Sequence, residues 1–91
     1  MAYRYGDATP DIKKAVWKKG SVIEGYDPNV YRRDICGTAM QYDQHGKGGK
    51  YGWEIDHIKP SALGGSDELF NLQPLYWQTN QRKSDTYPWS C

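Results

Sequence analysis

Two short stretches of the chain carry side chains suited to acid–base and metal chemistry. In the first, Asp56 and His57 are adjacent, at the point where an apolar segment gives way to the loop around Gly64-Gly65. Histidine titrates near neutral pH and can take a proton from water, and a carboxylate is a hard ligand that suits magnesium or manganese. Two interpretations are open: one of the pair is an ordinary surface residue, or both face the same small reactive site.

The second stretch is Asn80-Gln-Arg-Lys83. If these residues are helical, Asn80 lies three or four positions from several side chains and shares a face with them. They are Tyr76, Trp77, Lys83 and Ser84. Asparagine is unfavourable inside a helix, which favours a specific role for Asn80. Lys83 is expected to meet a phosphate, although a solvated helix face explains the same residue almost as well.

The element that must position Asp56 and His57 is a half-buried strand. Tyr51, Trp53 and Ile55 alternate at period two, but the alternation breaks before the next apolar residue, and Pro60 forbids a continuing ladder. On a regular strand Asp56 and His57 would face opposite ways. The pattern therefore predicts a strand over 51–55 and then a bend, at which both side chains flank one site.

Turn and cap residues predict the elements that follow. Gly64-Gly65 permits a tight turn, and Ser66 can cap one helical turn through Leu69. A short return strand is expected over 71–73. Pro74, tolerated in a first helical turn, then opens a second helix that runs to about Ser84.

The first half of the chain reads as a support region. Thr9 and Pro10 predict a helix start, and Gly20 predicts its end. Short strands are expected over 31–36 and 39–42. Between 45 and 50 the composition predicts a flexible loop, in which His45 is an exposed residue and carries no expected role.

Length and cysteine content restrict the class of protein. At 91 residues the chain is expected to form one domain, residues 1–91. Two cysteines cannot make a disulfide framework, and without a CxxC pair a zinc knuckle is not supported. No stretch approaches membrane-spanning length and none suits a signal peptide, so we expect no membrane partner. The default expectation is a cytoplasmic protein in a reducing compartment.

The charge balance predicts weak binding to nucleic acid. Twelve basic and eleven acidic residues leave a net charge of +1, unlike a free-standing DNA-binding domain. We expect about three or four phosphate contacts. The candidates are Lys83, Arg82, Lys50, Lys47, Arg33 and Arg32.

Three segments together resemble the HNH endonuclease family, in its Asp-His…Asn…Asn variant. They are "WEIDHIKP" at 53–60, "GGSDELFNLQPL" at 64–75 and "NQRKSD" at 80–85. The resemblance implies an α+β fold with a ββα-metal core. That core would span 51–85, with an N-terminal helix and short extra strands in a support region at 1–50 and a tail at 86–91. The chain departs from the zinc-ribbon subtype, which has two CxxC pairs.

The resemblance also implies roles for individual residues. Asp56 and Asn80 would bind one Mg²⁺ or Mn²⁺. His57, Asn71 and Lys83 would form the catalytic set, with His57 as the general base and Asn71 bracing the loop. The implied reaction is metal-dependent hydrolysis of phosphodiester bonds in DNA, cutting one strand per event. The alternative is a non-catalytic HNH-like nucleic-acid-binding module within a larger defence, phage or mobile-element complex. A small structural metal-binding protein is a third reading.

Overall fold

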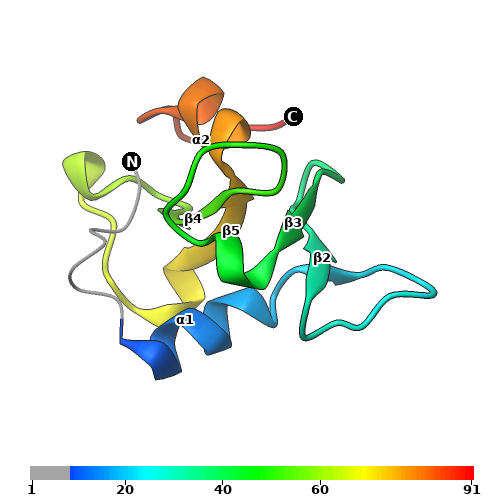
Figure 1. Ribbon diagram of the computed structural model, residues 1–91. Coiled ribbons are helices and arrows are strands. Elements are labelled where there is room, and N and C mark those ends of the chain that lie inside the picture. Colours follow the sequence, from blue (N-terminus) through cyan, green and yellow to red (C-terminus); the bar gives the residue numbers. More distant parts are fainter. Residues whose placement is uncertain (1–8) are drawn as a thin grey trace.

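The computed structural model describes residues 9–91, which form a mixed α+β structure (Figure 1). The helices are α1 (Pro10–Trp17) and α2 (Trp77–Lys83), and three short 3-10 turns lie between them. The strands are β1 (Ser21–Val22), β2 (Tyr31–Arg33), β3 (Ala39–Gln41), β4 (Trp53–His57) and β5 (Leu72–Tyr76). The α+β expectation is confirmed.

The strands form two antiparallel sheets. One has the order β1-β2-β3, and the other is the pair β4-β5. In the second sheet Asp56 lies opposite Gln73 and His57 lies opposite Leu72. Because α2 follows β5 directly, β4, β5 and α2 form a ββα unit (Figure 1).

Helix α1 begins as the sequence predicts and anchors the core. The Thr9 hydroxyl accepts the Ile12 N–H at 3.2 Å, and Pro10 occupies the first turn. Val16 and Trp17 are buried, and Trp17 packs on Trp53 of β4 with ring centroids 5.1 Å apart.

The buried apolar cluster takes one face of β4. It contains Val16, Trp17, Met40, Trp53, Ile55 and Leu72. Side chains alternate along a strand, so Glu54 and Asp56 face away from this cluster. Both are bonded to side chains of α2, which covers that other face.

Strand β4 runs two residues further than predicted. Asp56 and His57 lie within the ladder, opposite Gln73 and Leu72, and not at a bend after Ile55. Cross-strand partners on β5 hold the extended backbone after apolar alternation has ended, because strand formation depends on pairing context. The two residues therefore follow the strand and not the predicted bend. Neighbouring side chains on a strand point to opposite faces, and Asp56 contacts Lys83 of α2 whereas His57 contacts Asp67 of the Gly-rich loop; both side chains are buried.

The prediction for Pro74 was also wrong. Pro74 lies inside β5, opposite Ile55, and α2 begins at Trp77. A strand with a neighbour on one side only can accommodate a residue without an N–H. The 3-10 turn after the Gly-rich loop covers Leu69–Asn71, later than predicted, and β1 was not predicted.

A disulfide joins Cys36 to Cys91, with the two Cα atoms 5.6 Å apart. It ties the end of the tail to the turn between β2 and β3. The sequence reasoning set both cysteines aside, so this crosslink was missed. Disulfides persist mainly in oxidising compartments, so this bond does not fit the reducing compartment that was expected; the cytoplasmic location stays a prediction. Within residues 9–91, neither helix has the length and apolar character needed to cross a membrane.

Candidate active site

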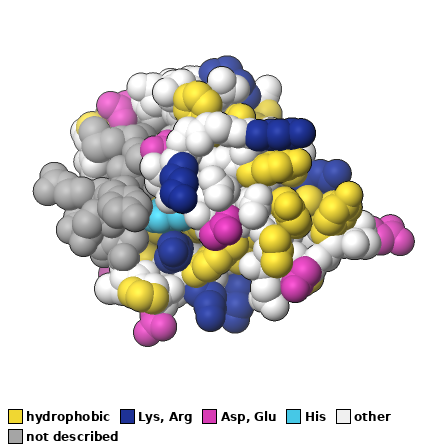
Figure 2. All heavy atoms as spheres, in the orientation of Figure 1, with side chains coloured by type: hydrophobic (Ala, Val, Ile, Leu, Met, Phe, Trp, Pro, Cys, Tyr) yellow, Lys and Arg dark blue, Asp and Glu magenta, His cyan; other side chains and the backbone are white. Residues whose placement is uncertain are grey.

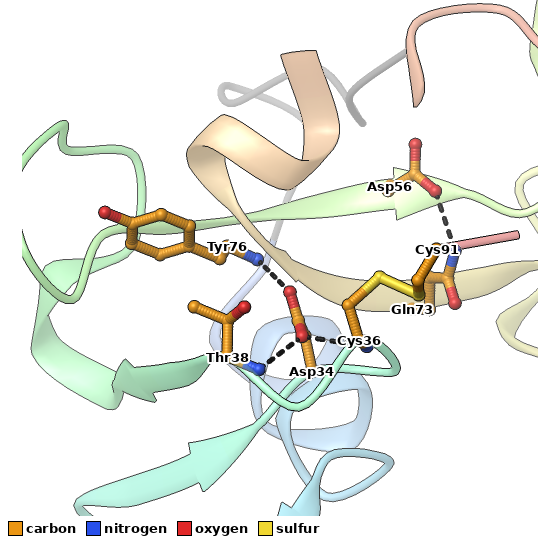
Figure 3. The surroundings of a disulfide bond; sticks show 7 residues. All are labelled: Asp34, Cys36, Thr38, Asp56, Gln73, Tyr76 and Cys91. Carbon is orange, nitrogen blue, oxygen red and sulfur yellow. Dashed lines mark hydrogen bonds between the residues drawn. A yellow bond between two sulfur atoms is a disulfide. The ribbon is translucent and has the colours of Figure 1, made fainter. Parts of the chain in front are cut away.

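Asp56 is fully buried between β5 and α2. Its Oδ2 accepts a hydrogen bond of 2.9 Å from Gln73 Nε2 (Figure 3). Lys83 Nζ lies 3.3 Å from Oδ2 and 3.4 Å from Oδ1. Burial raises the pKa of the Asp56 carboxyl, while Gln73 and Lys83 oppose that rise by stabilising the carboxylate.

Lys83 reaches from α2 into the interior and has an exposed fraction of 2%. Besides meeting Asp56, its ammonium donates to the His57 carbonyl oxygen at 2.8 Å. The buried Lys83 ammonium thus contacts the Asp56 carboxylate and the His57 backbone. These are contacts to β4, whereas the sequence predicted a contact to phosphate.

Asn80 lies one turn before Lys83 on α2 and is oriented by Glu54. Its Nδ2 donates to Glu54 Oε1 at 2.9 Å, which fixes the amide so that the oxygen is its remaining polar group. Asn80 Oδ1 is buried and has no hydrogen-bond partner in the described structure. A buried acceptor left unpaired costs about 1–3 kcal/mol, so this oxygen, like the neighbouring Thr79 hydroxyl, can accept from or bind to a further group.

His57 is buried and is held by an acid from the Gly-rich loop. Its Nε2 lies 2.7 Å from Asp67 Oδ1, and the Asp67 side chain is 75% exposed. When Nε2 donates to Asp67, Nδ1 becomes the proton-accepting nitrogen of the imidazole. Asp67 was not predicted as a site residue. The available signal was an acid in the Gly-Gly-Ser-Asp turn, ten residues after His57.

Asn71 bridges the two sides of that loop. Its Oδ1 accepts the Lys59 N–H at 2.9 Å, and its Nδ2 donates to the carbonyl oxygens of Lys59 at 3.0 Å and Ser66 at 2.8 Å. Gly65 permits this approach, because a Cβ there would lie 1.7 Å from the Lys59 oxygen. The bridge is the geometry expected of a loop brace; a part for Asn71 in catalysis stays a prediction.

The remaining candidate phosphate contacts are spread over the surface. Arg82, Lys50, Lys47 and Arg33 are exposed. Basic side chains on the face in Figure 2 are interspersed with acidic and apolar ones and form no single patch. Arg32 is instead committed to the fold, since its guanidinium donates to the carbonyl oxygens of Pro28, Lys18 and Gly20.

His45 is not the exposed loop residue that was expected. Its ring packs on Trp53 with centroids 4.7 Å apart. Burial, and to a lesser degree the Lys13 ammonium, lower the pKa of His45 to about 4. This histidine is a neutral packing residue at neutral pH.

The donor atoms near Asp56 fit a small hard cation. The Asp56 carboxylate and the unpartnered Asn80 oxygen are both hard ligands, of the kind that magnesium and manganese prefer. Between residues 9 and 91 there is no cluster of three or more His, Cys, Asp or Glu side chains placed to bind a metal. Asp56 on β4 and Asn80 on α2 therefore remain the predicted pair of metal ligands.

Comparison with known proteins identifies the family of the chain. The family model described as HNH endonuclease matches residues 41–86, just over half of the chain, and the match includes β4, β5 and α2. No curated protein and no solved structure gives a significant match. The family supports a nuclease-type function with a nucleic-acid substrate. The ββα unit and the family match together show that the chain belongs to the HNH endonuclease family.

Proposed function

We propose that the protein is a metal-dependent endonuclease that hydrolyses phosphodiester bonds of DNA and nicks one strand per event. Asp56 and Asn80 would hold one Mg²⁺ or Mn²⁺. When bound, such an ion offsets the charge that develops on the phosphate and on the leaving oxygen. The observation that carries the proposal is the Asn80 amide oxygen, buried without a partner on the helix that also contacts Asp56.

His57 would take the proton from the attacking water. Asp67 orients the imidazole through Nε2 and would stabilise the imidazolium that forms, so Nδ1 is the nitrogen expected to accept the proton. Lys83 and Asn71 are positioning residues in this scheme. Lys83 holds the backbone of His57 and the carboxylate of Asp56, and Asn71 keeps the loop that carries Asp67 closed on itself.

Plasmid nicking tests this proposal directly. Supercoiled DNA incubated with the protein and Mg²⁺ should accumulate nicked circles before linear product, and a chelator should abolish the reaction. Asp56→Asn should be inactive. Gln81→Ala, an exposed change on the same helix as Asn80, is the matched control and should cleave like the wild type. Cleavage that persists with chelator or in Asp56→Asn would contradict the proposal. DNA bound but never cut with metal would favour the non-catalytic binding module.

A further inference from the structure

A cavity of about 420 Å³ lies against the residues that hold Asp56. Its lining includes Gln73 and Lys83, the two side chains bonded to that carboxylate. It also includes Ile58, the residue after His57. The cavity therefore borders the two side chains that hold Asp56, although Asp56, His57 and Asn80 are not themselves part of its lining.

The rest of the wall is largely apolar and aromatic. Ile35 comes from the turn between β2 and β3, and Tyr87 and Trp89 come from the C-terminal tail. Aromatic walls with few polar groups suit a flat ligand that has a π-face. The volume is within the range of small-molecule sites and exceeds that of a single water.

The tail that forms this wall is attached at both ends. Thr86 N–H donates to the Lys83 carbonyl oxygen at 3.0 Å, and Cys91 is bonded to Cys36. Figure 3 shows this disulfide beside Gln73, whose amide points to Asp56. A wall fixed before binding lowers the ordering cost of taking up a ligand.

We propose that this cavity is a subsite for one nucleobase of the substrate, next to the scissile phosphate, with Trp89 and Tyr87 as its stacking surface. A base suits the cavity better than a phosphate does, because the cation in the wall, Lys83, is engaged by Asp56 and His57. A base inside a duplex is stacked and paired, so it must leave the stack to enter. The inference rests on the proposed nuclease function and assigns it a substrate class: single-stranded or locally unpaired DNA.

Mononucleotide binding tests the subsite without any cleavage. The disulfide-bonded protein is titrated with thymidine 5′-monophosphate, and the indole N–H signals are followed by NMR, with Trp89→Phe used to assign the Trp89 signal. The nucleotide should shift the Trp89 signal, and deoxyribose 5-phosphate should not. Equal shifts from both compounds, or no shift from the nucleotide, would overturn the proposal.

Cleavage of dinucleotides measures the contribution of the base. Each substrate has one phosphodiester, and each base in turn is replaced by an abasic residue. One of the two replacements should lower kcat/KM by about tenfold, the size expected for loss of a stacked base. In Trp89→Ala, the ratio of kcat/KM for the intact dinucleotide to kcat/KM for the abasic one should be close to one. Tyr87→Ala, at a side chain that is 48% exposed, should lower it and covers the case in which Trp89→Ala does not fold.

Phe70→Ala is the matched control, since Phe70 is a 78% exposed aromatic residue that does not line the cavity. It should keep the wild-type ratio. A wild-type ratio of one, or a ratio unchanged in both tail variants, would overturn the subsite. Absence of any metal-dependent cleavage by the wild type would instead refute the nuclease function, and the NMR titration would then decide the subsite alone.

Discussion

Asp34 and Asp56 are both buried carboxylates, but they are held in different ways. Asp34 Oδ1 accepts the N–H groups of Cys36 and Thr38, each at 2.9 Å, and its Oδ2 accepts the Tyr76 N–H at 3.0 Å. Asp56 is held by the side chains of Gln73 and Lys83. Figure 3 shows the three hydrogen bonds to Asp34 and the one from Gln73 to Asp56 in one view.

The difference separates a carboxylate with a structural role from one with a proposed functional role. We call Asp34 with its three backbone donors the Asp34 corner, and Asp56 with Gln73 and Lys83 the Asp56 corner. Backbone donors cannot leave Asp34 unless the turn or the start of α2 unfolds. Side-chain donors can rotate and share Asp56 with another ligand, and burial raises the pKa of the Asp56 carboxyl. Asp34 thus joins the turn after β2 to the end of β5, whereas Asp56 is the carboxylate that we propose binds a cation.

The largest expected effect lies at the Asp56 corner. His57→Ala should lower the rate of DNA cleavage by about a hundredfold to ten-thousandfold, because the general base is lost. Binding of Mn²⁺ should change little, since His57 is assigned to water and not to the ion. A parallel titration of wild type and variant with Mn²⁺ checks this. If affinity fell as steeply as rate, His57 would be a ligand and its assigned role would be wrong.

Lys83→Met should be the most destabilising change at the same corner. It removes the buried ammonium that lies 3.3 Å from Asp56 Oδ2, and breaking such a buried ion pair costs about 3–5 kcal/mol of unfolding free energy. A divalent ion can replace the lost charge, so Mg²⁺ should raise the Tm of the variant more than that of the wild type. Thermal melts with and without Mg²⁺ measure both effects. An equal rise in Tm would show that the ion does not contact Asp56.

Asp34→Ala should produce the opposite pattern. Three backbone N–H groups lose their acceptor, and we expect the free energy of unfolding to fall by about 3 kcal/mol. Below the melting transition, cleavage per folded molecule should match the wild type. Urea denaturation and rate measurements on the same samples test the pair of outcomes. A fully stable but inactive variant would remove the distinction between the two corners.

The smallest expected effect is a pH dependence away from both corners. The pKa of His45 is about 4 in the folded state and lies near 6.5 in an unfolded chain. Between these values the unfolded chain binds more protons, so the stability contributed by neutral His45 is lost as pH falls from about 6.5 to 4. His45→Gln should show a smaller fall in Tm across this range. If the Tm of His45→Gln fell as much as that of the wild type, other groups would be responsible for the loss of stability at acid pH.

Local patterns in the sequence predicted the elements whose causes are local. Thr9 and Pro10 mark the start of α1, and the alternation of Trp53 and Ile55 marks β4. The motif also singled out Asp56 and Asn80, which the structure places on facing elements.

The contacts that were missed join residues distant in sequence. Gln73 meets Asp56 from 17 positions away, Asp34 meets the backbone of Tyr76 from 42, and the disulfide spans 55. Such contacts depend on how the elements pack, and no periodicity or capping signal encodes them. Pro74 was misplaced for a related reason, because a proline suits both a helix start and a strand with one open side.

Binding of Mn²⁺ to the wild type and to Asn80→Ala, measured by electron paramagnetic resonance, tests the central claim most directly. The account predicts one ion per wild-type chain and an affinity lower by about tenfold or more in Asn80→Ala, comparable to the loss seen when a metal site is disturbed. Asn80→Asp should restore binding, and Gln81→Ala should bind like the wild type. An Asn80→Ala variant that retains the wild-type affinity would contradict the assignment of Asp56 and Asn80 as the metal pair.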